Sequence, residues 1–331
     1  MNTDQLRENF PDETACRTFF ESVIWQKGRI CPHCFCEKSY HISGKTSRSG
    51  LYECDKCKRQ FTVTTKTPMH STKLHLWKWL QAMYYIANSS KGISSVFLAK
   101  WIGVSQKTAW KMGHAIREMM DPGTENQPVL SGIVELDEKY LGGKPRYKKG
   151  VKHKRGKGTE KQCILVAVER NGAVRSAPVE SDKTSDLSPL VKSFVQKDSY
   201  LMTDQNPVYC QIAKQYAGHS WVNHHQKEYA RENVYNNTAE SFNSILERAK
   251  QGVFHYMSKK HLPRYLHEIG FRWDHRIPKV KVTKNGKKKT VMIPMPVMVL
   301  LRSILNRASG RQLRRSITGG IVRLNVKLAG N

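Results

Sequence analysis

The sequence predicts a mixed α/β protein whose main domain is preceded by two smaller segments. Three observations support this prediction. Four cysteines stand in two closely spaced pairs before residue 60. Apolar residues at helical spacing follow over residues 72–120. From residue 132 to 230, strand-like apolar runs alternate with helix-like ones, a pattern typical of a sheet covered by helices.

The charge of the chain indicates the class of partner. Lys and Arg together number 56 and Asp and Glu 27, so the 331-residue chain has a formal charge of +29. Such an excess favours a polyanion, and nucleic acid foremost. An anionic membrane is the alternative, but no basic amphipathic helix with a clean apolar face stands out. The sequence has neither an 18-residue apolar run nor a signal-peptide layout, so we expect a cytoplasmic protein.

Changes in composition divide the chain into four expected parts. They are an N-terminal helix with the cysteine-bearing segment (1–70), a helical segment resembling a helix-turn-helix (71–124), an α/β domain (130–277) and a basic, irregular tail (278–331). Within the tail, the stretch "IPMPVMVLLRSIL" is either a packing element or an oligomer contact. The expected helices of the α/β domain lie at about 187–197, 207–217, 237–250 and 259–275.

The cysteine pairs predict one structural zinc ion. They are Cys31 and Cys34, then Cys54 and Cys57. Two C-x-x-C knuckles separated by 19 residues are typical of a zinc ribbon, in which each knuckle places two thiolates beside one tight turn. Cys36 and His33 are possible competing ligands, but the paired knuckles have the simpler geometry.

The stretch "SGKTS" (Ser43–Ser47) resembles the end of a phosphate-binding loop. That motif requires a glycine where this chain has Ser39, and the stretch falls between the two zinc knuckles. We therefore expect no nucleotide cofactor.

The helical segment predicts two helices joined at Gly103. Ser105 is placed to cap the second helix. The first turn of that helix would then expose Gln106, Lys107 and Thr108, which are side-chain types that contact bases in a major groove. The alternative is a plain helical hairpin with a solvated polar face.

Three acidic residues are candidates for a catalytic metal site. Asp137 and Asp204 each end a strand-like run, and Glu240 lies in the first turns of a helix that Asn237 or Thr238 is placed to cap. Adjacent strands of one sheet would bring the two aspartates together. Two such carboxylates plus one from a helix could hold two Mg²⁺ or Mn²⁺ ions, which prefer oxygen ligands. Taken singly, an acidic residue in such a position is more often a turn former or a helix cap.

Several phrases, in order, carry a family resemblance. They are "FPDETACRTFFESVIWQKGRICPHC", "VELDEKYLGGK", "TDQNPVY" and "NHHQKEYARENVYNNTAESFNSILERAKQGVFHYMSKKHLPRYLHEIGFRWDHR". Over roughly residues 10 to 276 the chain resembles the IS1595-type (ISXO2-like) insertion-sequence transposases. The resemblance implies a ribonuclease H-like DDE domain behind an N-terminal zinc ribbon.

The resemblance also implies an activity and a set of residues. Asp137, Asp204 and Glu240 would be the catalytic metal ligands. Some relatives have Asn at the third site, so Asn237 is expected to assist and to contact DNA. The implied reaction is metal-dependent hydrolysis at the element ends, followed by transesterification that joins the freed 3′-hydroxyl to target DNA.

One position departs from the family pattern. The family often has a lysine seven residues after the third acidic residue, where this chain has Glu247. Arg248 and Lys250 are therefore the basic residues expected to meet a DNA phosphate. His224, His225 and Tyr229, which precede the third motif, would either contact DNA or pack on an edge strand.

Basic segments outside these motifs are expected to follow the DNA backbone. The loop 142–162 contains Lys148, Lys149, Lys154 and Arg155, and the tail contains "KNGKKK" and "RQLRR". The alternative is a solvated charged loop. The expected partners are terminal inverted repeats and target DNA. Two element ends must be held together, so a homodimer or a higher oligomer is expected.

Three other functions are alternatives for a chain with these features. The first is a catalytically silent, zinc-ribbon regulator derived from a transposase, and the second is a transcription factor that binds DNA without cleaving it. The third is a ribonuclease H-type nuclease that cuts DNA but does not join it. The complete acidic triad and the DNA-reading segments favour the transposase.

Overall fold

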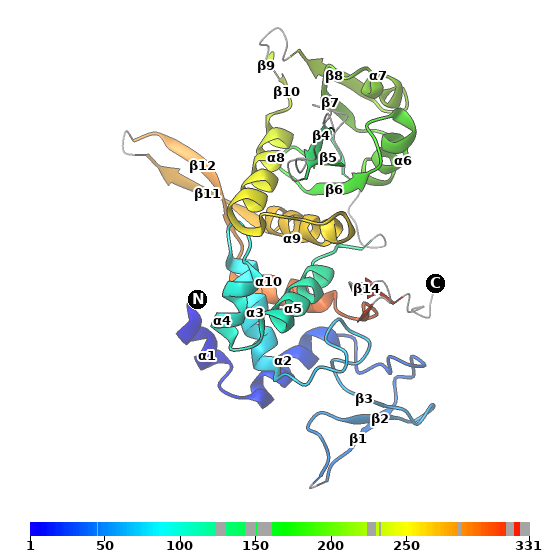
Figure 1. Ribbon diagram of the computed structural model, residues 1–331, viewed down its shortest axis with the longest axis vertical. Helices are drawn as coiled ribbons and strands as arrows, with labels where there is room; N and C mark the ends of the chain where they lie inside the picture. The colour runs from blue at the N-terminus through cyan, green and yellow to red at the C-terminus, as the bar shows by residue number, and fades with distance from the viewer. Residues whose placement is uncertain are drawn as a thin grey trace. The chain divides into compact units, whose positions relative to one another are not determined.

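The computed structural model divides the chain into two compact units (Figure 1). Unit 1 comprises Met1–Pro122 and His275–Asn331, and unit 2 comprises Gly123–Asp274. The residues that the structure describes are 1–44, 46–123, 130–142, 150, 161–223, 230–231, 233–283, 286–315 and 321–324. Among these, no helix has the length and apolarity needed to cross a membrane.

Unit 1 is built mainly from helices. They are α1 (Thr3–Asn9), α2 (Glu13–Ile24), α3 (Leu76–Asn88), α4 (Ser95–Ile102), α5 (Gln106–Met119) and α10 (Val297–Asn306). The apolar stripe predicted on α3 is buried, including Leu80, Met83 and Ile86. Helix α10 packs against α2, α3 and α5. Its apolar side chains, such as Leu301 and Ile304, are buried there, so this part of the tail is a packing element.

A small three-stranded sheet follows α2 within unit 1. Its strands are β1 (Ser39–His41), β2 (Tyr52–Cys54) and β3 (Gln60–Phe61), in the antiparallel order β1-β2-β3. Tyr52 and Phe61 are buried beside the cysteines, and Trp25 packs on them. These aromatic contacts hold the ribbon strands against the end of α2.

The C-terminal segment is more ordered than predicted. It forms a hairpin of β11 (Arg276–Val282) and β12 (Lys288–Pro294), then a short pair of β13 (Leu313–Arg315) and β14 (Ile321–Arg323). The prediction of an irregular tail was wrong because alternating β-branched residues pair across the turn despite the high charge.

The expectation that all of "RQLRR" follows DNA was also wrong. Arg311 is buried, and its guanidinium donates to the backbone carbonyl of Glu118 at 2.8 Å and lies 3.4 Å from the Asp121 carboxylate. This arginine therefore ties the tail to the end of α5.

Unit 2 is organised around a five-stranded mixed sheet. Its strands are β4 (Ile133–Leu141), β5 (Gln162–Glu169), β6 (Val174–Val179), β7 (Tyr200–Asp204) and β8 (Gly218–Val222). The order is β6-β5-β4-β7-β8. Strands β4, β5 and β6 pair antiparallel, whereas β7 runs parallel to both β4 and β8. The strand-like runs predicted between residues 132 and 230 form these strands.

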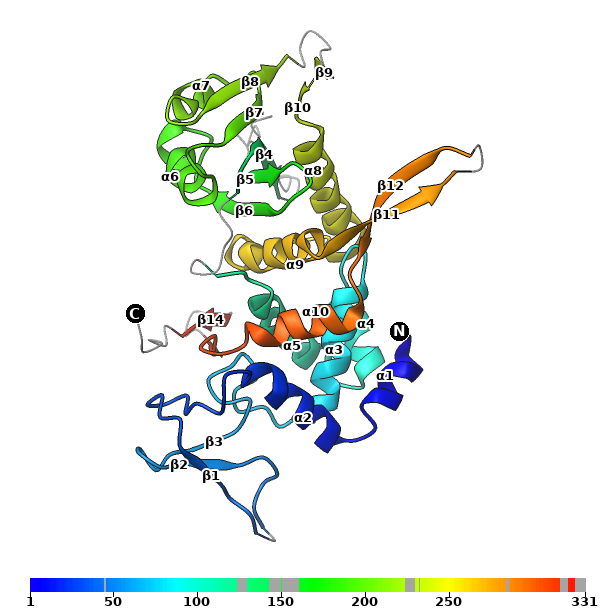
Figure 2. The ribbon, with the colours of Figure 1, turned by 180° about the vertical axis from the view of Figure 1, so that it is seen from behind.

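Helices cover both faces of this sheet (Figures 1 and 2). They are α6 (Thr184–Phe194) and α7 (Pro207–Ala213) on one face, and α8 (Asn237–Ala249) and α9 (Leu262–Asp274) on the other. Short elements complete the unit: β9 (Ala230–Arg231), β10 (Val234–Tyr235), the π-helical η3 (Lys250–Phe254) and the 3₁₀ turn η4 (Lys259–His261).

Successive side chains of β4 point to opposite faces of the sheet. Val134 and Leu136 join the core under α6 and α7. Glu135 and Asp137 point the other way and make hydrogen bonds to α8. The acidic end of β4 is thereby placed beside the first turns of α8.

Candidate active site and metal centres

The structure brings Asp137 and Asp204 together, as the sequence predicted. Strands β4 and β7 are parallel, with Glu135 opposite Met202, so the two aspartates lie at the same level two residues further along. One carboxylate oxygen of each, together with one of Glu138, falls within a group whose members are all within 4.8 Å of one another. The three side chains are partly buried. This edge of the sheet therefore concentrates negative charge.

This negative charge affects the protonation of Asp137. The pKa of its carboxyl is raised from 3.8 to about 6, first by burial and next by the nearby negative charge of Asp204. The amide of Asn243 and the backbone N–H of Glu138 oppose this shift, and Glu240 adds to it. An all-oxygen, anionic donor set of this kind suits a hard divalent cation. The residues present thus fit the expected Mg²⁺ or Mn²⁺.

Asn243 is a site residue that the sequence prediction missed. Its buried side chain donates from Nδ2 to Oδ2 of Asp137 at 2.6 Å. Its Oδ1 makes no hydrogen bond to the residues that the structure describes. Asn243 follows Glu240 by three positions on α8, so a polar residue on the buried stripe of that helix was the signal that could have found it.

Glu138 is the second missed residue, and it faces the other side of β4. Its Oε1 accepts a hydrogen bond from Nδ2 of Asn206 at 3.1 Å. The side-chain oxygen of Asn206 caps α7 by accepting a hydrogen bond from the backbone N–H of Val208. The backbone N–H of Asn206 donates to Oδ1 of Asp204 at 3.1 Å. Asn206 therefore connects two of the carboxylates.

The remaining predicted members of the site lie on the first turn of α8. Asn237 and Glu240 are both exposed. The Glu240 carboxylate raises the pKa of Asp137, so the two charges interact. The compact group of ligand oxygens consists of Asp137, Glu138 and Asp204 and does not include Glu240.

The predicted cap of α8 was wrong. The N-cap residue is Asn236, and its side chain makes no capping hydrogen bond. Instead, the carboxylate of Glu135 on β4 accepts from the backbone N–H groups of Thr238, at 2.7 Å, and Ala239, at 3.0 Å. The buried Glu135 carboxylate thus accepts hydrogen bonds from N–H groups that have no partner within the helix, and its negative charge complements the positive end of the helix dipole. It takes the place of the local cap predicted at Asn237 or Thr238.

Glu135 also forms a buried ion pair. Its side chain is 0% exposed, and its Oε1 lies 2.8 Å from Nε of Arg170. The same guanidinium donates to the carbonyl oxygens of Asn233 and Tyr235, each at 2.8 Å, and lies over the Tyr235 ring at 3.6 Å from its centroid. Arg170 therefore holds the segment that leads into α8. The signal in the sequence was a glutamate inside an apolar strand.

The four paired cysteines form one cluster, as predicted. One Sγ from each of them lies within 4.8 Å of the others, with 3.7 Å between Cys31 and Cys57 and 3.4 Å between Cys34 and Cys54. The pKa of the Cys54 thiol is lowered to about 6, and the largest cause is the hydrogen bond from the backbone N–H of Cys57. This lowered pKa favours the thiolate. This arrangement fits a tetrahedral zinc ion.

Cys36 does not join that cluster. Its thiol lies 3.6 Å from the backbone oxygen of Lys38. His33 contributes its backbone N–H, which donates to Sγ of Cys31 at 3.4 Å. The two alternative ligands considered from the sequence therefore stand outside the four-sulfur group.

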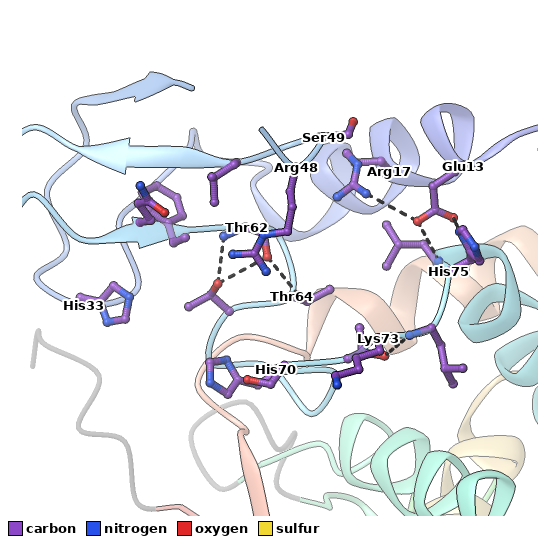
Figure 3. Close-up of a pocket in the computed structure, with 18 residues that line it drawn as sticks. Glu13, Arg17, His33, Arg48, Ser49, Thr62, Thr64, His70, Lys73 and His75 are labelled. Carbon is purple, nitrogen blue, oxygen red and sulfur yellow. Dashed lines mark hydrogen bonds and ion pairs between the residues drawn. The ribbon is translucent and has the colours of Figure 1, made fainter. Parts of the chain in front are cut away.

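A cleft of about 490 Å³ lies beside the zinc ribbon within unit 1 (Figure 3). Its lining includes the cationic side chains of Arg17, Arg48 and Lys73 and the hydroxyls of Thr62 and Thr64. Arg48 and Lys73 are exposed. The cleft thus presents cations and hydroxyl groups, which are common phosphate-binding groups.

The one acidic side chain of that lining, Glu13, is already engaged. Its carboxylate accepts from the backbone N–H groups of Leu76, at 2.9 Å, and Trp77, at 3.4 Å, and so caps α3. It also lies 3.5 Å from Nη2 of Arg17 (Figure 3). Glu13 therefore does not neutralise Arg48 or Lys73.

The predicted DNA-reading residues form the first turn of α5. Gly103 ends α4 in the left-handed conformation, with φ of 63°, and Ser105 caps α5 by accepting from the N–H of Thr108. Gln106 and Lys107 are exposed. The Gln106 amide donates to Ser95 Oγ at 2.8 Å, which connects the two helices.

Other predicted DNA contacts are distributed differently. Arg248 is exposed on α8, whereas Lys250 donates to the carboxylate of Glu247 at 3.1 Å. Lys139 lies 3.9 Å from the other oxygen of Glu247. The predictions for Lys148, Lys149, Lys154, Arg155, His224, His225 and Tyr229 fall outside the described residues.

Comparison with known proteins gives two matches to family models and one to a curated protein. Residues 129–274 match the ISXO2-like transposase domain, and residues 11–60 match the transposase zinc-ribbon domain. The chain is 26% identical over 286 residues to an uncharacterized protein in transposable element ISH50 of Halobacterium salinarum. That alignment covers 80% of this chain and 92% of the relative.

Two solved structures with similarity to the chain come from the Mos1 transposase. The pre-cleavage Mos1 transpososome is 13% identical, with 59% of this chain and 73% of that chain covered and a TM-score of 0.26. The Mos1 strand transfer complex is 11% identical, with 59% and 75% covered and a TM-score of 0.22. Both matched models describe parts of the same kind of transposase, so the chain contains an ISXO2-like transposase domain preceded by a transposase zinc-ribbon domain.

Proposed function

We propose that this protein is an active insertion-sequence transposase that cuts the ends of its element and joins them to target DNA. The observation that carries the proposal is the juxtaposition of Asp137 and Asp204 at one edge of the unit 2 sheet. Burial and the repulsion between the two carboxylates raise the pKa of Asp137, and a divalent cation bound between them would relieve that repulsion.

The sheet supports a ribonuclease H-like assignment for unit 2. Numbered along the chain, its five strands lie in the order 3-2-1-4-5, with the first three antiparallel and the last two parallel to the first. The central strand is β4, which carries Asp137, and its parallel neighbour β7 carries Asp204. This arrangement agrees with the domain that the family implies.

The side chains of the site have different proposed roles in metal binding. Asp137 and Asp204 supply ligand oxygens, and Glu240 is our proposed third ligand because α8 places it on the side of β4 that Asp137 faces. Asn243 holds the Asp137 carboxylate in one orientation. Divalent cations bound there would neutralise the phosphate and activate the attacking hydroxyl, and two of them are typical of such sites.

The proposed reaction has two displacements at phosphorus. In the first, water attacks the phosphodiester at the element end, the P–O3′ bond breaks, and a free 3′-hydroxyl remains. In the second, that 3′-oxygen attacks a target phosphodiester, so one P–O bond forms while another breaks and its oxygen leaves as a new 3′-hydroxyl. The bonds are exchanged one for one, and no nucleotide cofactor is required.

DNA is held in this proposal by groups in both units. In unit 1 these are the first turn of α5, with Gln106, Lys107 and Thr108, and the cationic cleft with Arg48 and Lys73. In unit 2, Asn237, Arg248 and Lys250 on or next to α8 complete the set. The DNA would include the terminal inverted repeats and the target, held by a homodimer or larger assembly in the cytoplasm.

A strand-transfer assay tests the proposal. Purified protein, shown to hold zinc, is mixed with labelled element-end DNA, a plasmid target and Mg²⁺ or Mn²⁺. The Asp204→Asn variant is compared with Asp198→Asn, because Asp198 is an exposed aspartate away from the cluster. We expect metal-dependent joined product from the wild type and Asp198→Asn, and none from Asp204→Asn. DNA binding without cutting or joining would instead indicate a silent DNA-binding regulator.

A further inference from the structure

The hairpin of β11 and β12 groups three exposed lysines on one face near its turn. Lys281 lies directly opposite Lys289, and Lys279 lies two positions along on the same face. These three residues are called the lysine face here. Closer to the base of the hairpin the same face carries apolar residues, whereas the opposite face mixes Lys288 with the exposed Val280 and Val282.

This hairpin lies beyond the matched family models. The transposase-domain model ends at residue 274, and the hairpin runs from Arg276 to Pro294. Residues 279–283 are all exposed, and in both views the ribbon extends away from the helices of unit 1 (Figures 1 and 2). Its role must therefore be argued from its own residues.

The lysine face is electrostatically unbalanced. Like charges directly opposite each other across a strand pair destabilise it, as Lys281 and Lys289 do here. From His275 to the end of the chain the sequence contains no Asp or Glu, so this segment supplies no anion of its own. An isolated two-stranded ribbon is marginally stable in water. A partner that brings negative charge would remove the repulsion and stabilise the ribbon.

The dimensions suit duplex DNA. Each strand has seven residues, so the ribbon is roughly 23 Å long at about 3.3 Å per residue. A two-stranded ribbon is an established DNA-binding element, and regularly spaced lysines contact successive phosphates. We propose that the lysine face of this hairpin binds the phosphodiester backbone of double-stranded DNA, independently of its base sequence. The inference rests on the proposed function for its DNA partner but adds a surface outside the catalytic unit and the helical segment.

The test measures DNA affinity against salt. The full-length variant Lys279→Gln/Lys281→Gln/Lys289→Gln is compared with the wild type on a random-sequence duplex by fluorescence anisotropy. The slope of log K against log salt is expected to fall by about 0.9 for each phosphate contact removed, with at least an about tenfold loss of affinity near 0.1 M salt. Because the three side chains are exposed and their mutual repulsion is removed, the circular dichroism spectrum should not change and the melting temperature should not fall.

Two matched controls accompany that variant. The triple Lys→Arg variant at the same positions keeps the charge and is expected to bind like the wild type. Lys192→Gln/Lys197→Gln/Lys214→Gln removes the same charge from exposed positions in unit 2, and its salt slope should match the wild-type value. A loss of affinity equal to that of the hairpin variant would mean that net charge alone is responsible, and would overturn the proposal.

The remaining outcomes are also distinguishable. Unchanged affinity and slope in the Lys→Gln hairpin variant, with normal wild-type binding, would overturn this inference and leave the proposed function intact. Unchanged DNA binding with an altered mass in sedimentation would show that the hairpin contacts another protein chain instead. Absence of DNA binding by the zinc-loaded wild type would overturn the proposed function itself.

Discussion

Glu135 on β4 and Thr238 on α8 are 103 positions apart in sequence, yet the Glu135 carboxylate accepts both the backbone N–H and the hydroxyl of Thr238, at 2.7 and 3.0 Å. Two positions after Glu135, Asp137 accepts from Asn243 on the same helix. Strand and helix are thereby connected at two points, and one of them, Asp137, belongs to the acidic cluster itself. The position of α8 relative to Asp137, and hence that of Glu240, depends on this pair of contacts.

Removal of the buried carboxylate should destabilise unit 2. Glu135→Ala leaves the Arg170 guanidinium and two helix N–H groups without their partner, so we expect the free energy of unfolding to fall by about 3 kcal/mol. Urea denaturation followed by circular dichroism measures this change. Glu180→Gln, at an exposed glutamate, should change stability by less than about 0.5 kcal/mol. Equal stabilities would show that the ion pair contributes nothing net.

Mutation of the two aspartates should abolish the stabilisation that metal confers. At a concentration of Mn²⁺ about 100-fold above its dissociation constant, bound metal is expected to stabilise the wild type by about 2.7 kcal/mol, which raises its melting temperature. Asp137→Asn and Asp204→Asn should show no such rise. Without metal, Asp137→Asn should be more stable than the wild type, because burial and the charge of Asp204 disfavour the ionised Asp137. A manganese-dependent rise in either variant would argue against a shared site.

Variants of Glu240 and Glu138 distinguish which glutamate supplies the third carboxylate ligand of the proposed metal site. We expect Glu240→Gln to abolish strand transfer, whereas Glu138→Gln should retain it at a reduced rate, because Glu138 faces α7 and is held by Asn206. Asn237→Ala should reduce DNA affinity only slightly. Strand transfer is measured with each variant at saturating DNA. The reverse order, with Glu138→Gln silent and Glu240→Gln active, would assign the third ligand to β4.

Zinc content distinguishes the four-sulfur cluster from its neighbours. Cys54→Ser should lose the single zinc ion and become sensitive to proteolysis between residues 31 and 61, because metal binding and folding of such ribbons are coupled. Cys36→Ser should keep one zinc per chain, since its thiol faces Lys38. Elemental analysis by mass spectrometry after dialysis gives both values. Zinc loss in Cys36→Ser would mean that the ligand set differs from the observed cluster.

The cleft of unit 1 should contribute to DNA affinity through its cations. Arg48→Gln/Lys73→Gln is expected to reduce the salt slope of binding by about 1.8 if each side chain contacts one phosphate. Lys192→Gln/Lys197→Gln, with the same loss of charge at exposed positions, serves as the control. Anisotropy titrations at several salt concentrations compare the two. Identical slopes would place the DNA away from this cleft.

Local spacing in the sequence was enough to predict much of the architecture. The two C-x-x-C knuckles position thiolates by the geometry of single turns, and the short apolar runs of β4, β5 and β7 indicate buried strands. Asp137 and Asp204 were predictable because parallel neighbouring strands end at the same edge of a sheet. Each of these inferences needed only short segments and one general rule of packing.

The contacts that complete the site were decided by tertiary structure. Glu135 and Asn243 meet partners 103 and 106 positions away, and which side chains occupy the space between β4 and α8 depends on how that helix packs on the sheet. The cap of α8 was misassigned for the same reason, since a carboxylate from a distant strand replaced the expected local residue. In the tail, the sequence showed positive charge, but only strand pairing placed Lys281 opposite Lys289 on a single face. Sequence thus determined which chemical groups this protein has, and long-range packing decided which of them meet.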